Sequence, residues 1–164
     1  MADFTVRPAV RADAAALADL LNEIIVAGGT TAYQIPFTPE RFAEAHIDGP
    51  AVLTCIVAED QAGVPMGFQI LLRDERLPER WGDIGTFARR GMTTRGIGSA
   101  LFAATREAAR GLGLVGINAT IRADNEGGLT FYGKQGFQDH SVASAVPLND
   151  GTPVDRISKR YPLV

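Results

Sequence analysis

The feature that most constrains the fold is a pair of apolar segments in the first half of the chain, Val52 to Ala58 and Val64 to Leu72. Only the turn-forming residues Glu59 to Gly63 separate them. A connection this short joins antiparallel neighbours, because parallel strands need a crossover of roughly a dozen residues or more. Pro65 lies at the start of the second segment, where a strand tolerates the missing N–H. The sequence therefore predicts a β-hairpin at this point.

A strand and two helices are expected before this hairpin. Phe4 to Ala9 is the strand candidate, and the first helix follows, with Asp13 as its cap and Gly28-Gly29 as its end. Thr38-Pro39-Glu40 combines an N-cap residue, a proline and an acid, so a second helix is expected to run to about Ile47. The first helix carries an apolar stripe at helical spacing, formed by Leu17, Leu20, Leu21, Ile24 and Ile25.

The second half of the chain alternates strands and helices. The expected strands are 83–88, 115–121, 137–146 and 155–161, the last two joined by a turn at Asn149-Asp150-Gly151. The expected helices are one that begins near Ile97 and ends near Gly111, and a short one over 125–135. Ile97, Leu101, Ala104 and Ala108 fall on one face of the longer helix. With the hairpin, this order predicts a mixed sheet flanked by helices.

Composition excludes several classes of protein. The 164 residues are 46% hydrophobic and 21% charged, which is typical of one globular domain and not of a disordered chain. Cys55 is the only cysteine, so we expect no internal disulfide, and the reducing cytoplasm is the expected location. His46 and His140 lack partners at metal spacing, and a net charge of −3 argues against nucleic-acid binding. The sequence shows neither a leader pattern nor a long apolar run, so we expect neither secretion nor a membrane partner.

Positive charge is nevertheless concentrated in one segment. Residues 89–110 contain five arginines and one glutamate. Within this segment, small residues connect a strand to a helix, and the first N–H groups of a helix have no partner inside it and lie at the positive end of its dipole. Gly96 and Gly98 let an anion approach these amides, and Arg95 can add a charged contact. The junction is therefore predicted to bind a small anion.

Two common phosphate-binding motifs do not match this junction. A P-loop requires Gly-Lys followed by Ser or Thr, which is absent here. The dinucleotide fingerprint requires a third glycine where Leu101 stands, and it follows the first strand of a parallel repeat, whereas this junction follows a hairpin in mid-chain.

Two segments carry a resemblance to a known family. One segment is similar to the acetyl-CoA pyrophosphate loop Q/R-x-x-G-x-G/A of the GNAT superfamily of N-acetyltransferases, namely Thr93-Thr94-Arg95-Gly96-Ile97-Gly98-Ser99-Ala100-Leu101. A later segment resembles the second cofactor motif of that superfamily, an Asn and a Tyr before a closing Gly-Phe. This segment is Asn125-Glu126-Gly127-Gly128-Leu129-Thr130-Phe131-Tyr132-Gly133-Lys134-Gln135-Gly136-Phe137. The chain departs from the first motif at Thr93, where the family has Gln or Arg, and at Thr94, where it often has Gly. The glycines of the second motif also make its helix intrinsically weak.

The resemblance implies a fold and a reaction. The fold would be a single domain over residues 1–164, of the α/β (α+β) class, with a mixed, mostly antiparallel sheet of about seven strands and four helices. The reaction would be direct attack of an amine on the thioester of acetyl-CoA, the co-substrate, without a metal. The residues that would bind acetyl-CoA are Phe87, Ala88, Thr93, Thr94, Arg95, Gly96, Ile97, Gly98, Ser99, Ala100, Asn125 and Tyr132.

The resemblance also implies individual roles. A backbone N–H near Phe87 or Ala88 would stabilise the charge on the thioester oxygen, and Tyr132 would be the general acid for the departing sulfur. Asn125 would hydrogen-bond the amide arm of acetyl-CoA while it caps its helix. Asp83 resembles the acidic position that many members use as a base, although a solvated strand-end residue is an equal interpretation. Glu23 and Asp74 are other candidates for the base.

The acceptor is expected beside the connection between the first two helices. This segment runs from Gly28 to Pro39, and Thr31 and Tyr33 are the candidate substrate-binding residues. Its similarity to the phosphinothricin acetyltransferase branch implies the primary amine of a small molecule, an amino acid or an analogue. The alternatives are a protein N-acetyltransferase and an acyl-CoA-binding module that has lost its chemistry. An open sheet edge near the C-terminus could support a homodimer.

Overall fold

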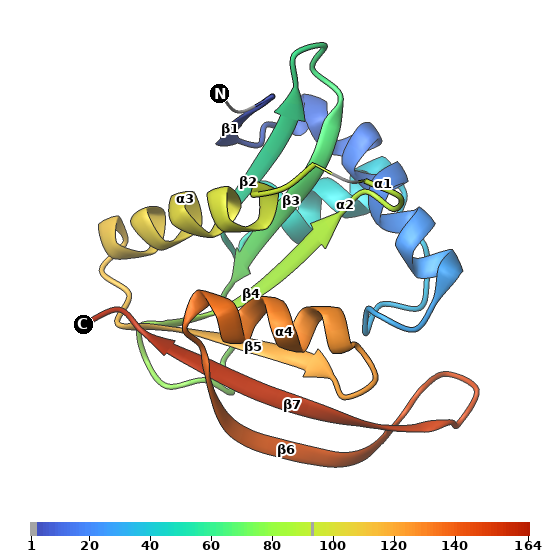
Figure 1. The fold of residues 1–164 in the computed structure, drawn as a ribbon, viewed down its shortest axis with the longest axis vertical. Coiled ribbons are helices and arrows are strands. Elements are labelled where there is room, and N and C mark those ends of the chain that lie inside the picture. The colour runs from blue at the N-terminus through green and yellow to red at the C-terminus, as the bar shows by residue number, and fades with distance from the viewer. Residues whose placement is uncertain (1–2, 93) are drawn as a thin grey trace.

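A computed structural model describes residues 3–92 and 94–164. Within these residues the chain forms one seven-stranded sheet in the order β1-β2-β3-β4-β5-β7-β6, with four α-helices and a short 3-10 helix (Figure 1). Every neighbouring pair of strands is antiparallel except β4 and β5. The predicted fold class, a mixed and mostly antiparallel sheet with four helices, is confirmed.

The elements follow the predicted order. The strands are β1 (Phe4–Pro8), β2 (Val52–Asp60), β3 (Pro65–Leu72), β4 (Trp81–Ala88), β5 (Gly116–Arg122), β6 (Gln138–Pro147) and β7 (Pro153–Pro162). The helices are α1 (Ala14–Ala27), α2 (Pro39–His46), α3 (Ile97–Gly111) and α4 (Glu126–Gln135), with the 3-10 helix η1 (Arg11–Asp13) before α1. The predicted hairpin is formed by β2 and β3.

The helices cover both faces of the sheet. Neighbouring residues of a strand point to opposite faces. Val57 of β2 packs in the cluster that contains Leu17 of α1, whereas Ile56 packs in the cluster that contains Ile97 and Leu101 of α3. In Figure 1 α1 and α2 lie behind the sheet, and α3 and α4 lie in front of it. Among the described residues, no helix covers the face of β5, β7 and β6 that lies opposite α4 (Figure 1).

Several strand bounds differ from the expectation by one or two residues, and one expected core face was wrong. β4 begins at Trp81 and not at Asp83, so Asp83 lies inside the strand. On α3 the buried residues after Leu101 are Phe102, Thr105 and Ala109, not Ala104 and Ala108. Burial of the large Phe102 ring beside Leu101 rotates the core-facing stripe by one residue, and the smaller alanines are left at its margin.

Of the three N-caps predicted from the sequence, one was wrong and two are confirmed. Asp13 occupies the N-cap position of α1, but its side chain makes no capping bond. Thr38 caps α2 as predicted, since its hydroxyl accepts from the N–H of Arg41. Asn125 caps α4 in the same way by accepting from the N–H of Gly128.

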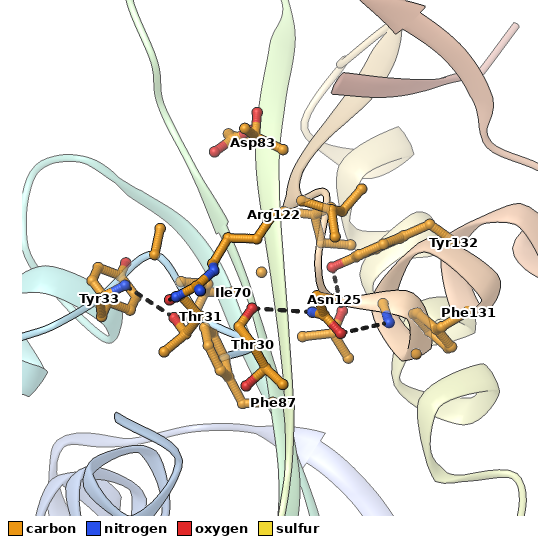
Figure 2. A pocket seen from close by; sticks show the side chains of 18 of the residues that line it. Thr30, Thr31, Tyr33, Ile70, Asp83, Phe87, Arg122, Asn125, Phe131 and Tyr132 are labelled. Carbon is orange, nitrogen blue, oxygen red and sulfur yellow. Dashed lines mark hydrogen bonds between the residues drawn. The ribbon is translucent and has the colours of Figure 1, made fainter. Parts of the chain in front are cut away.

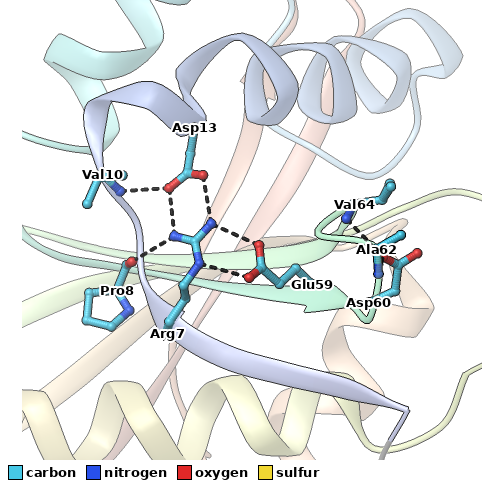
Figure 3. Close-up of polar contacts among 8 residues, drawn as sticks. All are labelled: Arg7, Pro8, Val10, Asp13, Glu59, Asp60, Ala62 and Val64. Atoms are coloured by element: carbon cyan, nitrogen blue, oxygen red, sulfur yellow. Dashed lines mark hydrogen bonds and ion pairs between the residues drawn. The ribbon is translucent and has the colours of Figure 1, made fainter.

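Asp13 instead belongs to an ionic cluster that joins three elements (Figure 3). The Arg7 guanidinium donates to both oxygens of Asp13 at 2.8 and 2.9 Å and to both oxygens of Glu59 at 2.9 and 3.1 Å. Asp13 also accepts from the N–H of Val10 at 2.7 Å. The Arg7 guanidinium holds the pKa of Asp13 below its usual range. The cluster therefore fixes β1 against β2 and the start of α1.

We expect Arg7→Met to lower the free energy of unfolding by about 2 kcal/mol, because the variant leaves two partly buried carboxylates without their shared cation. Arg11→Met is the matched control, since the Arg11–Asp48 ion pair is well exposed and should leave the unfolding midpoint nearly unchanged. Urea unfolding followed by circular dichroism measures both variants. Equal losses in the two variants would contradict the assignment.

Candidate active site

The site lies where the sheet opens between β4 and β5. The two parallel strands pair only from Trp81 to Ile84 and from Gly116 to Ala119, although β4 continues to Ala88 and β5 to Arg122. Beyond the last pair the strands diverge (Figure 1). A cleft of about 1120 Å³ occupies this opening and reaches the N-terminal end of α3. Figure 2 shows its wall, with Tyr132 on one side and Thr31 and Tyr33 on the other.

Backbone N–H groups at the end of β4 point toward this opening. Arg89 donates its N–H to Met66 across the β3 ladder at 2.8 Å. Because hydrogen-bonding direction alternates along a strand, the N–H of Phe87 also points toward β3, and those of Thr86 and Ala88 point toward the opening. The prediction named a backbone donor near Phe87 or Ala88, and the alternation selects Ala88. The ring of Phe87 instead stacks on Phe68 and Tyr33, with centroid distances of 4.9 and 6.2 Å.

The N-terminus of α3 forms a second wall of the cleft. Its first backbone bond runs from the N–H of Ala100 to the carbonyl of Gly96, so the amides of Ile97, Gly98 and Ser99 precede any bond of the helix. Gly96 has φ +85°, and an added Cβ would have no described atom within 4 Å. The glycine therefore keeps this turn accessible and in a conformation that other residues rarely adopt.

Gly98 is required for a different reason. A Cβ on Gly98 would lie 2.5 Å from the Phe131 ring, so glycine lets α3 pack closely against α4. Ser99 faces α4 as well, since its hydroxyl accepts from the Gln135 side chain at 3.0 Å. Thr94 lines the cleft, whereas Arg95 is exposed and lies outside its lining. Thr93 lies outside the described residues.

Tyr132 enters the opening from α4. The residue is only 6% exposed, and its hydroxyl lies 2.8 Å from the Thr86 hydroxyl. Burial raises the pKa of Tyr132, and the hydrogen bond from Thr86 opposes that rise. The rings of Phe131 and Phe137 contact Tyr132, both at centroid distances of 5.1 Å. This aromatic packing, together with the Asn125 cap, stabilises a helix that its glycines make intrinsically weak.

The connection between α1 and α2 is hydrogen-bonded to Arg122 at the end of β5 and to Asn125 at the start of α4 (Figure 2). The Asn125 side chain donates to the carbonyl of Thr30 at 3.0 Å, and the Arg122 guanidinium donates to the carbonyl of Thr31 at 3.2 Å. Arg122 also pairs with Asp124. Asn125 thus binds two other parts of the chain, the N-terminus of α4 and the Thr30 backbone.

The pKa of the Asp83 carboxyl group is raised in this site. Burial raises its pKa from 3.8 to about 6, against the lowering effect of the hydrogen bond that Asn118 donates at 2.9 Å. Asp74 also lines the cleft, but the Arg76 side chain beside it holds its pKa below the usual range. Glu23 is not among the lining residues. Of the three acids considered from the sequence, Asp83 alone combines contact with the cleft and a raised pKa.

Thr31 and Tyr33 also line the cleft, and both take part in packing. The Thr31 hydroxyl accepts from the N–H of Tyr33 at 3.1 Å, and burial raises the pKa of Tyr33 to about 12. The Tyr33 ring contacts Phe37 at 5.2 Å and His46 at 5.4 Å. Burial lowers the pKa of His46 to about 4, so this histidine is neutral in the aromatic cluster.

The sequence reasoning missed a polar strip on the sheet. Residues at alternate positions of β5 and β7 pair side by side and line the cleft, namely Asn118, Thr120, Arg122, Arg156, Ser158 and Arg160. Polar residues at every second position, between the apolar Ile117, Ala119 and Ile121, are a signal that could have identified this strip. Thr86 was missed as well, because a lone threonine in an apolar strand carries no motif.

The described residues also bear on the metal and membrane predictions. Among residues 3–92 and 94–164, no three His, Cys, Asp or Glu side chains gather in a way that would hold a metal ion. Within the same residues, no helix has the length and apolar character needed to cross a membrane.

Comparison with known proteins identifies the family. Residues 17–137 match the acetyltransferase (GNAT) family. The chain belongs to the GNAT acetyltransferase family. The family predicted from the two motifs is therefore confirmed, and so is the enzyme class, an N-acetyltransferase. No curated protein has a significantly similar sequence.

Solved GNAT structures share the fold at low sequence identity. A GCN5-related N-acetyltransferase from Kribbella flavida is 21% identical, with 98% of each chain covered and a TM-score of 0.83. A phosphinothricin acetyltransferase from Sinorhizobium meliloti in complex with acetyl-CoA is 19% identical, with 98% of this chain and 88% of that chain covered and a TM-score of 0.81. A ribosomal-protein-alanine N-acetyltransferase from Brucella melitensis is also 19% identical, with coverage of 96% and 99% and a TM-score of 0.81.

We expect Asp83→Asn to stabilise the protein at alkaline pH. The folded-state pKa of Asp83 lies above the unfolded value, so its stabilising contribution is complete below about pH 4 and is lost as the pH rises through about 6. The neutral amide avoids this loss and should raise the free energy of unfolding by about 2 kcal/mol at pH 8. Urea unfolding at pH 8 and at pH 4 measures the difference. A variant that is no more stable than wild type at pH 8 would contradict the raised pKa.

Proposed function

We propose that this GNAT protein transfers the acetyl group of acetyl-CoA to the primary amine of a small molecule, an amino acid or an analogue. The observation that carries the proposal is the opening between β4 and β5, which brings free main-chain amides, the end of α3 and the Tyr132 hydroxyl to one cleft. The known members of the family supply the reaction, and the cleft of this chain supplies groups that suit each part of it.

The α3 end of the cleft fits the diphosphate of acetyl-CoA. The first amides of α3 carry the positive end of the helix dipole, and the open turn at Gly96 lets phosphate oxygens reach them. Two exposed arginines of the neighbouring turn add positive charge, Arg90 in the lining of the cleft and Arg95 outside it. The departures of Thr93 and Thr94 from the family motif change side chains, whereas this kind of site binds chiefly through the backbone.

Ala88 and Tyr132 would act on the thioester group. In the transition state the acetyl oxygen gains negative charge, and the N–H of Ala88 would donate a hydrogen bond to it. Tyr132 would donate its proton to the sulfur as the carbon–sulfur bond breaks. Burial keeps Tyr132 protonated at neutral pH, which a proton donor requires.

Asp83 would take the proton that an ammonium group must lose before it attacks. With a pKa of about 6, the carboxylate is mostly ionised at neutral pH yet is more basic than an ordinary aspartate. Asn118 orients this carboxylate by donating to one of its oxygens. A water chain between the amine and Asp83 would serve equally, so Asp83 is proposed as the base and not as a fixed contact.

The charge of the acceptor end favours an amino-acid-like amine. Arg156 and Arg160 line the cleft on β7, and among the described residues neither has a carboxylate within 4.0 Å. The Arg156 Nε is buried without a hydrogen-bond partner among the described atoms. Arg160 already donates its Nε to Asn118 Oδ1 at 3.3 Å and lies over the Trp81 ring, so a carboxylate on the acceptor would pair first with Arg156. Thr31 and Tyr33 would then form the opposite wall of the acceptor site.

We expect Gly96→Ala to weaken acetyl-CoA binding about fivefold, because its Cβ occupies the space left for the diphosphate and strains the turn. Gly113→Ala is the matched control, since Gly113 also has positive φ and open space around it, but lies beyond the C-terminal end of α3. Both variants should lose similar stability, and only Gly96→Ala should lose affinity. Isothermal titration calorimetry measures the affinity, and equal affinities would contradict the proposed diphosphate site.

Wild-type protein should release the free thiol of CoA when it is given acetyl-CoA and a panel of amines that includes amino acids. Tyr132→Phe should lower kcat about 100-fold while the Kd for acetyl-CoA changes less than about twofold. A thiol-detection assay and calorimetry measure the two quantities. Full activity of Tyr132→Phe would remove the proton-donor role. Tight binding without thiol release from any amine would instead favour a module without catalysis.

Four expectations from the sequence stay predictions. They are the cytoplasmic location, the homodimer, the absence of a nucleic-acid partner, and the assignment of all 164 residues to a single domain. β6 lies at the edge of the sheet, as the homodimer prediction requires.

A further inference from the structure

A chain of hydrogen bonds runs from the interior of the sheet to Tyr132. The Gln69 side chain on β3 is fully buried, and its Nε2 donates to the Thr86 hydroxyl on β4 at 2.9 Å. The Thr86 hydroxyl in turn lies 2.8 Å from the Tyr132 hydroxyl on α4. Side chains from β3, β4 and α4 therefore meet in one polar chain. No sequence motif covers Gln69 or Thr86.

The chemistry of the groups sets the direction of this chain. The structure places the Gln69 Nε2 against Thr86 and leaves the Gln69 Oε1 buried without a hydrogen-bond partner among the described atoms. In this orientation the amide nitrogen can only donate, so Thr86 Oγ1 is the acceptor. The Thr86 proton must then be directed elsewhere, and the Tyr132 oxygen is the only other hydrogen-bond partner that its hydroxyl has among the described residues. If Tyr132 donated to Thr86 instead, the Thr86 proton would have no acceptor among the described residues and would depend on water in the cleft that Thr86 lines. The favoured direction is Gln69 to Thr86 to Tyr132.

This direction leaves the proton of Tyr132 free. When the Tyr132 oxygen accepts from Thr86, its own O–H points away from Thr86 and into the cleft that both residues line. Figure 2 shows the Tyr132 hydroxyl at the cleft, with a hydrogen bond that ends on it. The same accepted hydrogen bond stabilises the negative charge that develops on the Tyr132 oxygen as its proton leaves.

We propose that Gln69 and Thr86 are positioning residues that hold Tyr132 as a proton donor directed into the cleft. The inference rests on the proposed function. In the reaction the amine nitrogen forms a bond to the acetyl carbon, and the carbon–sulfur bond breaks with its electron pair on sulfur. Asp83 takes one proton from the ammonium group before the attack and passes it to solvent. The nitrogen loses a second proton to water as the amide forms. Tyr132 gives its own proton to the sulfur and regains one from that water.

Thr86→Val and Thr86→Ser test the relay. Valine has the shape of threonine without the hydroxyl, and we expect it to lower kcat about tenfold with little change in KM or in the Kd for acetyl-CoA. Serine keeps the hydroxyl and should retain activity within about threefold of wild type. Gln69→Leu should reduce kcat in the same direction as Thr86→Val, because the Thr86 hydroxyl loses the donor that orients it.

The double variant Thr86→Val/Tyr132→Phe separates the relay from a structural effect. If Thr86 acts through Tyr132, the valine should cause no further loss of kcat once the Tyr132 hydroxyl is gone. Thr105→Val on α3 is the control for the loss of a threonine hydroxyl, since Thr105 is fully buried and does not line the cleft, and it should keep the kcat of wild type.

The outcomes distinguish this inference from the proposed function. If wild-type protein releases no thiol with any amine, the proposed function fails and the relay fails with it. If wild type is active, three results would overturn the relay alone: unchanged kcat in Thr86→Val, a serine variant as slow as the valine variant, or losses that multiply in the double variant. A rise in kcat for Thr86→Val would also overturn it, because Tyr132 would then have been donating toward Thr86.

Discussion

The site depends on the short parallel pairing of β4 and β5. Four residues of each strand hold the two halves of the sheet together, and the strands then diverge. A longer pairing would engage the amide of Ala88 and fill the space that Tyr132 enters. The backbone donors of β4 are therefore left for a ligand by the geometry of the sheet, and no special side chain is needed to create them. The groups proposed for catalysis are arranged around this divergence.

The helix that carries Tyr132 illustrates why this arrangement needs the rest of the fold. Its glycines give α4 little stability of its own, and Tyr132 is its only buried residue. The Asn125 cap and the aromatic contacts of Tyr132 with Phe131 and Phe137 supply what the helix lacks. The contacts that stabilise the helix therefore also hold the tyrosine ring in position at the cleft.

The sequence predicted the order of the elements and the two motifs, because strand alternation, helical stripes and glycine-rich turns are local signals. It did not predict how α3 rotates about its axis, since the choice of Thr105 and Ala109 over Ala104 and Ala108 depends on packing of Phe102 against distant residues. The local pattern favours Asp13 as a cap, because its ion pair with Arg7 depends on how β1 packs against the start of α1. The alignment of Gln69 with Thr86 was also beyond reach, because it follows from the register of two strands. The divergence of β4 from β5 could not be predicted either, since both segments have ordinary strand sequences.

Asn125 links parts of the molecule that would otherwise vary independently. Its Oδ1 caps α4, the helix that carries Tyr132, and its Nδ2 donates to the carbonyl of Thr30, beside the residues proposed to contact the acceptor. A change in the length or path of that connection would act on the helix start through one side chain. Evolution of a new acceptor preference in this chain is therefore constrained: substitutions of side chains at Thr31 or Tyr33 alter the wall alone, whereas insertions or deletions around Thr30 also disturb the tyrosine on the far side of the cleft.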